Sequence, residues 1–124
     1  MAKILVIDDE PVVRVLLEIL LSEQGYDVIL AEGGWKGLEL FRREHPDVVV
    51  LDLKMPELDG VMVLKHIRRI DLNQPVIILT GAATPETEQQ VHALGATEIV
   101  EKEFTFDLLG HALKRVLKTP IPAA

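Results

Sequence analysis

Apolar residues occur along this chain in short, mostly uninterrupted runs, separated by longer segments with helical spacing. Short runs rich in Val, Ile and Leu predict strands that are covered on both faces. The runs lie at residues 3–7, 27–31, 48–52, 76–79 and 98–100. Helical spacing predicts helices at 11–23, 35–44 and 60–70, a fourth beginning at Pro85 and a last one from about 105 to 118.

Strands and helices therefore alternate five times, which predicts an α/β fold with a five-stranded parallel sheet and helices on both faces. The doubly wound, flavodoxin-like strand order 2-1-3-4-5 fits five such strands, and its ligand site lies beyond the carboxyl ends of the strands. We expect one domain at residues 1–118. Residues 119–124 contain two prolines and are expected to form a tail or the start of a linker.

The first and fourth predicted helices depart from an ordinary amphipathic pattern. The first is apolar nearly all round, with a polar stripe of Arg14, Glu18 and Ser22. Either neighbouring helices cover it, which we take as the expectation, or it exposes an apolar patch for a partner. The fourth offers only Val91 and Leu94 as an apolar stripe, so it should be the most mobile helix.

Composition narrows the class of protein. The 124 residues are 48% hydrophobic, enough for a core, and no apolar run has the length of a membrane span. The absence of cysteine excludes disulfides, thiolate metal sites and a cysteine nucleophile. With no signal-peptide pattern, a soluble cytoplasmic protein is expected. The net charge of −7 argues against nucleic-acid binding by this domain and favours a metal ion or a basic partner surface.

Polar residues whose side chains can bind a metal ion or take part in a reaction stand at the ends of four of the predicted strands. They are Asp8 and Asp9, Asp52, Thr80 and Lys102. Because parallel strands share one carboxyl edge, these side chains should converge. Each alone could be a cap, a turn residue or a solvated lysine, but together they indicate a site.

The three carboxylates would repel one another, and a divalent cation with a preference for hard oxygen ligands, such as Mg²⁺, offsets that repulsion. Asp52 follows a rigid strand and can act as a carboxylate nucleophile toward phosphorus. The Lys102 ammonium and the Thr80 hydroxyl can stabilise the phosphoryl oxygens. These residues predict metal-assisted phosphoryl transfer to Asp52, followed by slow hydrolysis.

The same residues carry a resemblance to a known family. The motifs are Asp8-Asp9, the segment Asp52-Leu53-Lys54-Met55-Pro56 with Gly60, Thr80-Gly81, and Lys102. With them the chain resembles, over nearly its whole length, the CheY-like response-regulator receiver domain of two-component signalling. The resemblance implies that Asp52 accepts a phosphoryl group from a histidine kinase or phosphotransfer protein. It implies that Mg²⁺ is held by Asp8, Asp9, Asp52 and the backbone carbonyl of Lys54.

The resemblance also implies an output. Thr80 is expected to move toward the phosphoryl group, and the surface of the fourth helix, fifth strand and fifth helix to change. A downstream protein or a fused output domain would detect that change, and the family's behaviour allows a homodimer. In the family the first helix contacts the phosphodonor, so Val12, Val13 or Leu17 is expected to touch it. The chain is expected to be a signalling domain rather than an enzyme.

Two positions depart from the family pattern. Glu103 follows Lys102 where the family has a proline with a cis bond. Since a cis bond before a non-proline residue costs roughly 3–4 kcal/mol, we predict a trans Lys102–Glu103 bond. Ile99 stands on the output surface where the family often has an aromatic ring, so the rotation of a large ring is lost.

Other classes remain open at this stage. A flavin- or nucleotide-binding protein of this topology would need a phosphate-binding loop after the first strand, where Asp8-Asp9-Glu10 is acidic. A hydrolase with an aspartate nucleophile would usually carry a second carboxylate at position 54, which is lysine. A degenerate receiver that binds partners without phosphorylation is favoured weakly by Glu103 and opposed by the intact site.

Overall fold

The computed structural model describes residues 2–81, 83–101 and 106–118. Its strands are β1 (Lys3–Ile7), β2 (Asp27–Ala31), β3 (Val48–Leu51), β4 (Val76–Thr80) and β5 (Glu98–Glu101). Its helices are α1 (Pro11–Glu23), α2 (Gly34–Glu44), α3 (Gly60–Ile70), α4 (Pro85–Ala93) and α5 (Phe106–Lys118). The predicted elements are all present, and their ends differ from the predictions by a residue or two.

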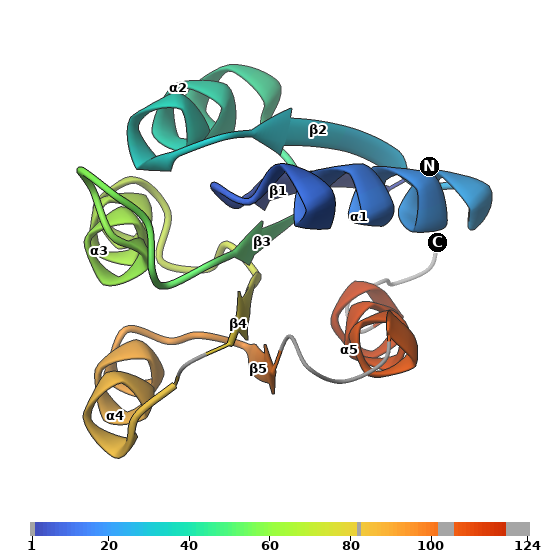
Figure 1. The fold of residues 1–124 in the computed structure, drawn as a ribbon. Helices are drawn as coiled ribbons and strands as arrows, with labels where there is room; N and C mark the ends of the chain where they lie inside the picture. The colour runs from blue at the N-terminus through green and yellow to red at the C-terminus, as the bar shows by residue number, and fades with distance from the viewer. Residues whose placement is uncertain (1, 82, 102–105, 119–124) are drawn as a thin grey trace.

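All strands pair in parallel in the order β2-β1-β3-β4-β5, so the predicted fold class and strand order are confirmed. Figure 1 shows α2, α3 and α4 along one side of the sheet and α1 and α5 along the other. Residues 119–124 lie outside the described residues, so the tail or linker there stays a prediction.

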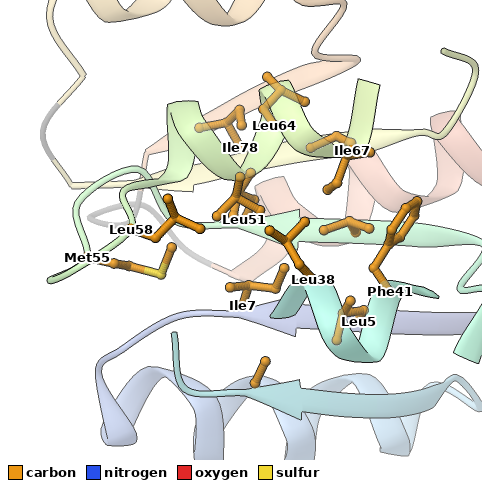
Figure 2. Close-up of a cluster of buried hydrophobic side chains, with 14 of the residues drawn as sticks. Leu5, Ile7, Leu38, Phe41, Leu51, Met55, Leu58, Leu64, Ile67 and Ile78 are labelled. Atoms are coloured by element: carbon orange, nitrogen blue, oxygen red, sulfur yellow. The ribbon is translucent and has the colours of Figure 1, made fainter. Parts of the chain in front are cut away.

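The sheet separates two apolar cores, because alternate residues of each strand point to opposite faces. In β3, Val49 and Leu51 pack toward α2 and α3, whereas Val48 and Val50 pack toward α1 and α5. Figure 2 shows the first core, where Leu51 lies among side chains of α2 and α3. Asp52 therefore follows a strand that is buried on both faces.

The interpretation that neighbours cover α1 is wrong. Leu17 and Leu21 are buried, but four apolar side chains of α1 are exposed: Val12 (70%), Val15 (53%), Leu16 (40%) and Ile19 (49%). A helix on a sheet buries one stripe, here built on Leu17 and Leu21, and α1 carries apolar residues well beyond that stripe. We call the four exposed residues the α1 patch.

In α4, Val91 is the buried side chain, as its weak apolar stripe predicted. The helix is stabilised at its start by a capping box between Thr84 and Thr87. Its mobility remains a prediction. Among the described residues, no helix combines the length and apolar character needed to cross a membrane.

Candidate functional site

The sheet brings Asp8, Asp52 and Thr80 to one edge. In the ladder Ile7 lies opposite Leu51, and Leu51 lies opposite Ile78, so Asp8, Asp52 and the end of β4 at Thr80 lie on neighbouring strands. The Asp52 amide donates to the Ile7 carbonyl at 3.0 Å, which extends the ladder to the carboxylate-bearing residue. Asp8, Asp52 and Thr80 are all buried, with 1%, 4% and 0% of their surfaces exposed.

The turn after β1 fixes the Asp8 side chain. Its Oδ1 accepts a hydrogen bond from the Glu10 amide at 2.9 Å, and the Asp8 carbonyl accepts one from Arg14 Nη1 at 2.7 Å. Pro11 then begins α1 without losing a hydrogen bond, because the first helical amides have no intrahelical partner. These two hydrogen bonds hold the turn and orient the Asp8 carboxylate.

The loop after β3 fixes Asp52. The Lys54 amide lies 3.4 Å from Asp52 Oδ1, and the Gly60 amide donates to the Leu53 carbonyl at 2.9 Å. Asp59 caps α3 by accepting from the Met62 amide at 3.0 Å. The loop thus returns to the strand end and holds Gly60 against the segment that carries the Asp52 carboxylate.

Three carboxylates gather in this site. One oxygen from each of Asp8, Glu10 and Asp52 lies within 4.8 Å of the others. Carboxylates this close repel, and hard oxygen ligands of this kind suit Mg²⁺, so the donor set fits the expected cation. Asp9 is half-buried and is not part of this group, so its role as a ligand stays a prediction. Sequence reasoning missed Glu10, whose proximity to Asp8 in the acidic run was the available signal.

The remaining predicted residues fall in different places. Thr80 ends β4 next to β3, as expected. Ile99 pairs with Ile78 and is half-buried against the core on the α2–α3 side. Lys102 and Glu103 lie outside the described residues, so the role of the lysine and the trans bond stay predictions. The Lys54 carbonyl also stays a predicted ligand.

A crevice of about 660 Å³ lies beside the site. It lies between α3 and α4, reaches from Thr84 at the start of α4 to Gln90, and extends along the loop after β3. Its lining includes Val61, Met62 and Lys65 on one wall and Thr84, Thr87 and Gln90 on the other, with Leu53 to Pro56 at the end near Asp52. We call it the α3–α4 crevice.

Comparison with known proteins gives consistent results. The family model "Response regulator receiver domain" matches residues 4–114. The chain is 36% identical over 115 residues to sporulation initiation phosphotransferase F of Bacillus subtilis, covering 93% of each. It is 39% identical over 116 residues to regulatory protein AtoC of Escherichia coli, covering 94% of this chain but 25% of that protein.

A solved structure is also similar. Response regulator TrrA of Thermotoga maritima, in complex with Mg²⁺ and BeF, has a TM-score of 0.86 and 37% identity. The match covers 94% of this chain and 99% of that one.

Proposed function

This chain belongs to the response regulator receiver domain family of two-component systems, and on that premise we propose that Asp52 accepts a phosphoryl group. The donor would be a histidine kinase or a phosphotransfer protein. The observation that supports this most directly is the place of Asp52, which directly follows a doubly buried strand with Asp8 and Glu10 within 4.8 Å.

In the proposed reaction an Asp52 carboxylate oxygen attacks the donor's phosphorus. A new O–P bond forms, and the bond from phosphorus to the donor nitrogen breaks, leaving its electron pair on that nitrogen. The neighbouring strands β1 and β4 would hold the carboxylate in position. A carboxylate that is already oriented toward the phosphorus reacts faster than a mobile one. Later attack by water on phosphorus would break the O–P bond and regenerate the Asp52 carboxylate.

Charge neutralisation is assigned to the residues around the acceptor. Asp8, Asp9, Asp52 and the Lys54 carbonyl would hold Mg²⁺, which, when bound, offsets the negative charge on the phosphoryl oxygens. The Thr80 hydroxyl and the Lys102 ammonium would donate hydrogen bonds to those oxygens. Glu10 adds a further carboxylate to the group, and its charge would strengthen attraction of a cation.

The consequence of phosphorylation would be a change on the surface of α4, β5 and α5. Thr80 would move toward the phosphoryl group, and Ile99 on β5 would respond by a change of rotamer. A downstream protein, a fused output domain or a second copy of the chain would detect this surface. The 25% coverage of AtoC shows that a receiver of this kind occurs within a longer protein. We place this activity in the cytoplasm and assign no nucleic-acid contact to this domain.

The α1 patch is the proposed contact for the phosphodonor. Of the three residues expected there, Val12 is 70% exposed and remains available for that contact, Val13 is half-buried, and the full burial of Leu17 excludes it. Val12 lies in the first turn of α1, two residues beyond Glu10, which places the apolar patch next to the acidic group. A donor could therefore contact the patch while its phosphorylated histidine approaches Asp52.

Intact-mass measurement tests the proposal. The protein is incubated with Mg²⁺ and acetyl phosphate, and Asp52→Asn and a chelator serve as controls. The expected result is one added phosphoryl group that is absent in both controls. Modification that persists in Asp52→Asn would contradict the assignment of the acceptor. If the wild type binds Mg²⁺ but is not modified, modification after Glu103→Pro would mean that the loop at Glu103 disables the lysine, and no modification after it would mean that Asp52 requires its cognate kinase.

A further inference from the structure

Arg68 on α3 connects four backbone carbonyls from two loops. Its Nε donates to the Leu94 carbonyl at 2.6 Å and its Nη2 to the Gly95 carbonyl at 2.9 Å. Its Nη1 donates to the Gln74 carbonyl at 2.8 Å and to that of Asp71 at 3.2 Å. We call this set of bonds the Arg68 clamp. It joins α3 to the residues that directly follow α4.

The chemistry of the clamp suits a fixed attachment. The last carbonyls of a helix lack intrahelical donors and carry partial negative charge, so a guanidinium both satisfies and neutralises them. The rigid, planar guanidinium of Arg68 reaches four carbonyls at once, whereas the ammonium of a lysine has three N–H donors and no fixed planar arrangement. Burial lowers the pKa of Arg68, an effect that Asp71 opposes, but arginine stays charged.

Gly95 makes the close approach feasible. Its φ is +79°, and a Cβ at that position would lie 3.3 Å from Arg68 Nε. A residue with a side chain would be strained there and would crowd the guanidinium. Glycine at position 95 therefore leaves the space that the Arg68 guanidinium occupies at the end of α4.

The other end of α4 is attached differently. There the α3–α4 crevice separates the two helices, with Thr84, Thr87 and Gln90 on the α4 wall. The capping box joins Thr84 to Thr87, so these hydroxyls stabilise α4 itself rather than its contact with α3. Figure 1 shows α3 and α4 on the same side of the sheet. The Arg68 clamp joins the two helices just beyond the C-terminal end of α4, and the α3–α4 crevice lies between them from the start of α4.

We propose that the Arg68 clamp is the point about which α4 turns when the receiver switches, and that its N-terminal half moves into the α3–α4 crevice. This inference rests on the proposed function, because movement of Thr80 toward Asp52 supplies the displacement. Thr80 ends β4, four residues before Thr84, and β3 lies beside β4. Displacement of Thr80 toward β3 draws the start of α4 toward Leu53 to Pro56, which line the crevice.

Spin labels can measure both ends of the helix, because the chain has no cysteine of its own. One labelled pair, Lys65→Cys with Glu86→Cys, spans the crevice end. A second pair, Arg69→Cys with His92→Cys, spans the clamped end. All four side chains are exposed. Distance distributions are recorded by double electron–electron resonance with and without Mg²⁺ and beryllium fluoride.

The expected result is a shorter distance for the crevice pair and an unchanged distance for the clamped pair. Equal displacement of both pairs, or lengthening of the crevice pair, would overturn the proposal. Arg68→Lys is expected to broaden the distribution of the clamped pair even without beryllium fluoride. Arg42→Lys, an exposed arginine on α2, is the matched control and should leave it unchanged.

The experiment separates this inference from the proposed function. Bound beryllium fluoride is detected by ¹⁹F NMR, and it should be absent in Asp52→Asn. If it is absent in the wild type, the proposed acceptor and the closure of the crevice both fail. The clamp is tested independently: an unchanged clamped pair in Arg68→Lys would overturn it whatever Asp52 does.

Discussion

Gly60 lies directly against the backbone of Asp52, and the space between them cannot hold a methyl group. A Cβ on Gly60 would collide with the Asp52 carbonyl oxygen and would lie 2.7 Å from the Leu53 Cα. Both neighbours are backbone atoms of the segment that carries the proposed acceptor. The absence of a side chain at position 60 therefore determines where the Asp52 carboxylate lies.

Gly60→Ala is expected to destabilise the fold and slow phosphorylation together, because the backbone at Asp52 must shift to relieve the collision. Forced overpacking of this kind costs about 1–3 kcal/mol. Urea unfolding measures the free energy, and acetyl phosphate with intact mass measures the rate.

The matched control for Gly60→Ala is Gly33→Ala, since no described atom lies within 4 Å of a Cβ added there and its backbone is extended. It should cost less than about 1 kcal/mol, as the loss of a helix-capping glycine. Equal effects of the two substitutions would contradict the role of Gly60.

The acidic residues after β1 give a second prediction, about Mg²⁺. Asp9→Asn should weaken Mg²⁺ binding by roughly tenfold or more, which is about 1.4 kcal/mol, because it removes a proposed direct ligand. Glu10→Gln should weaken it only about two- to threefold, since Glu10 is exposed and its charge is screened. Calorimetric titration with Mg²⁺ compares the variants.

The reverse order of effects would carry its own meaning. If Glu10→Gln lost more affinity than Asp9→Asn, the group of Asp8, Glu10 and Asp52 seen in the structure would itself be the ligand set. The family-like assignment of Asp9 would then be wrong for this chain.

Exposure of the α1 patch leads to a third prediction, about the donor. Val12→Ser should reduce kcat/KM for phosphotransfer from a histidine kinase by about tenfold, since burying a valine is worth roughly 1.5–3 kcal/mol and part of it is lost. The rate with acetyl phosphate should not change, because a small donor needs no docking surface. Leu72→Ser, at an apolar residue that is 77% exposed outside the patch, is the control. A loss with both donors would show that Val12 acts on the site and not on docking.

The sequence predicted the features that follow from the pairing of strands, and it did not predict side-chain contacts between residues far apart in the chain. Asp8 and Asp52 could be placed together because parallel strands impose a register, and the ladder pairs Ile7 with Leu51 as required. The clamp could not be predicted, because Arg68 looks like an ordinary surface arginine and its partners Leu94 and Gly95 lie 26 and 27 residues away. The expectation that neighbouring helices cover α1 was wrong because apolar character alone does not show which side of a helix the sheet covers.

The pair Glu98 and Arg115 gives a prediction about pH. Arg115 Nε and Nη2 each lie 2.9 Å from a Glu98 carboxylate oxygen, joining β5 to α5. The hydrogen bonds from Arg115 lower the pKa of Glu98, outweighing the opposite effect of burial. A carboxylate whose pKa is lower in the folded state stabilises the fold above its unfolded pKa, and this stabilisation is lost as pH falls through the folded pKa.

The difference in stability between wild type and Glu98→Gln should therefore be present at neutral pH and vanish in acid, below the ordinary pKa of a glutamate. It should be small, because Arg115 is exposed and solvent screens the pair, and it should shrink further in high salt. Urea midpoints measured from neutral to acid pH test this, with Glu88→Gln, at an exposed glutamate of α4, measured beside it as the matched substitution. A wild-type advantage that persists below the pKa of Glu98 would show that Glu98 stabilises β5 and α5 through packing and not through its charge.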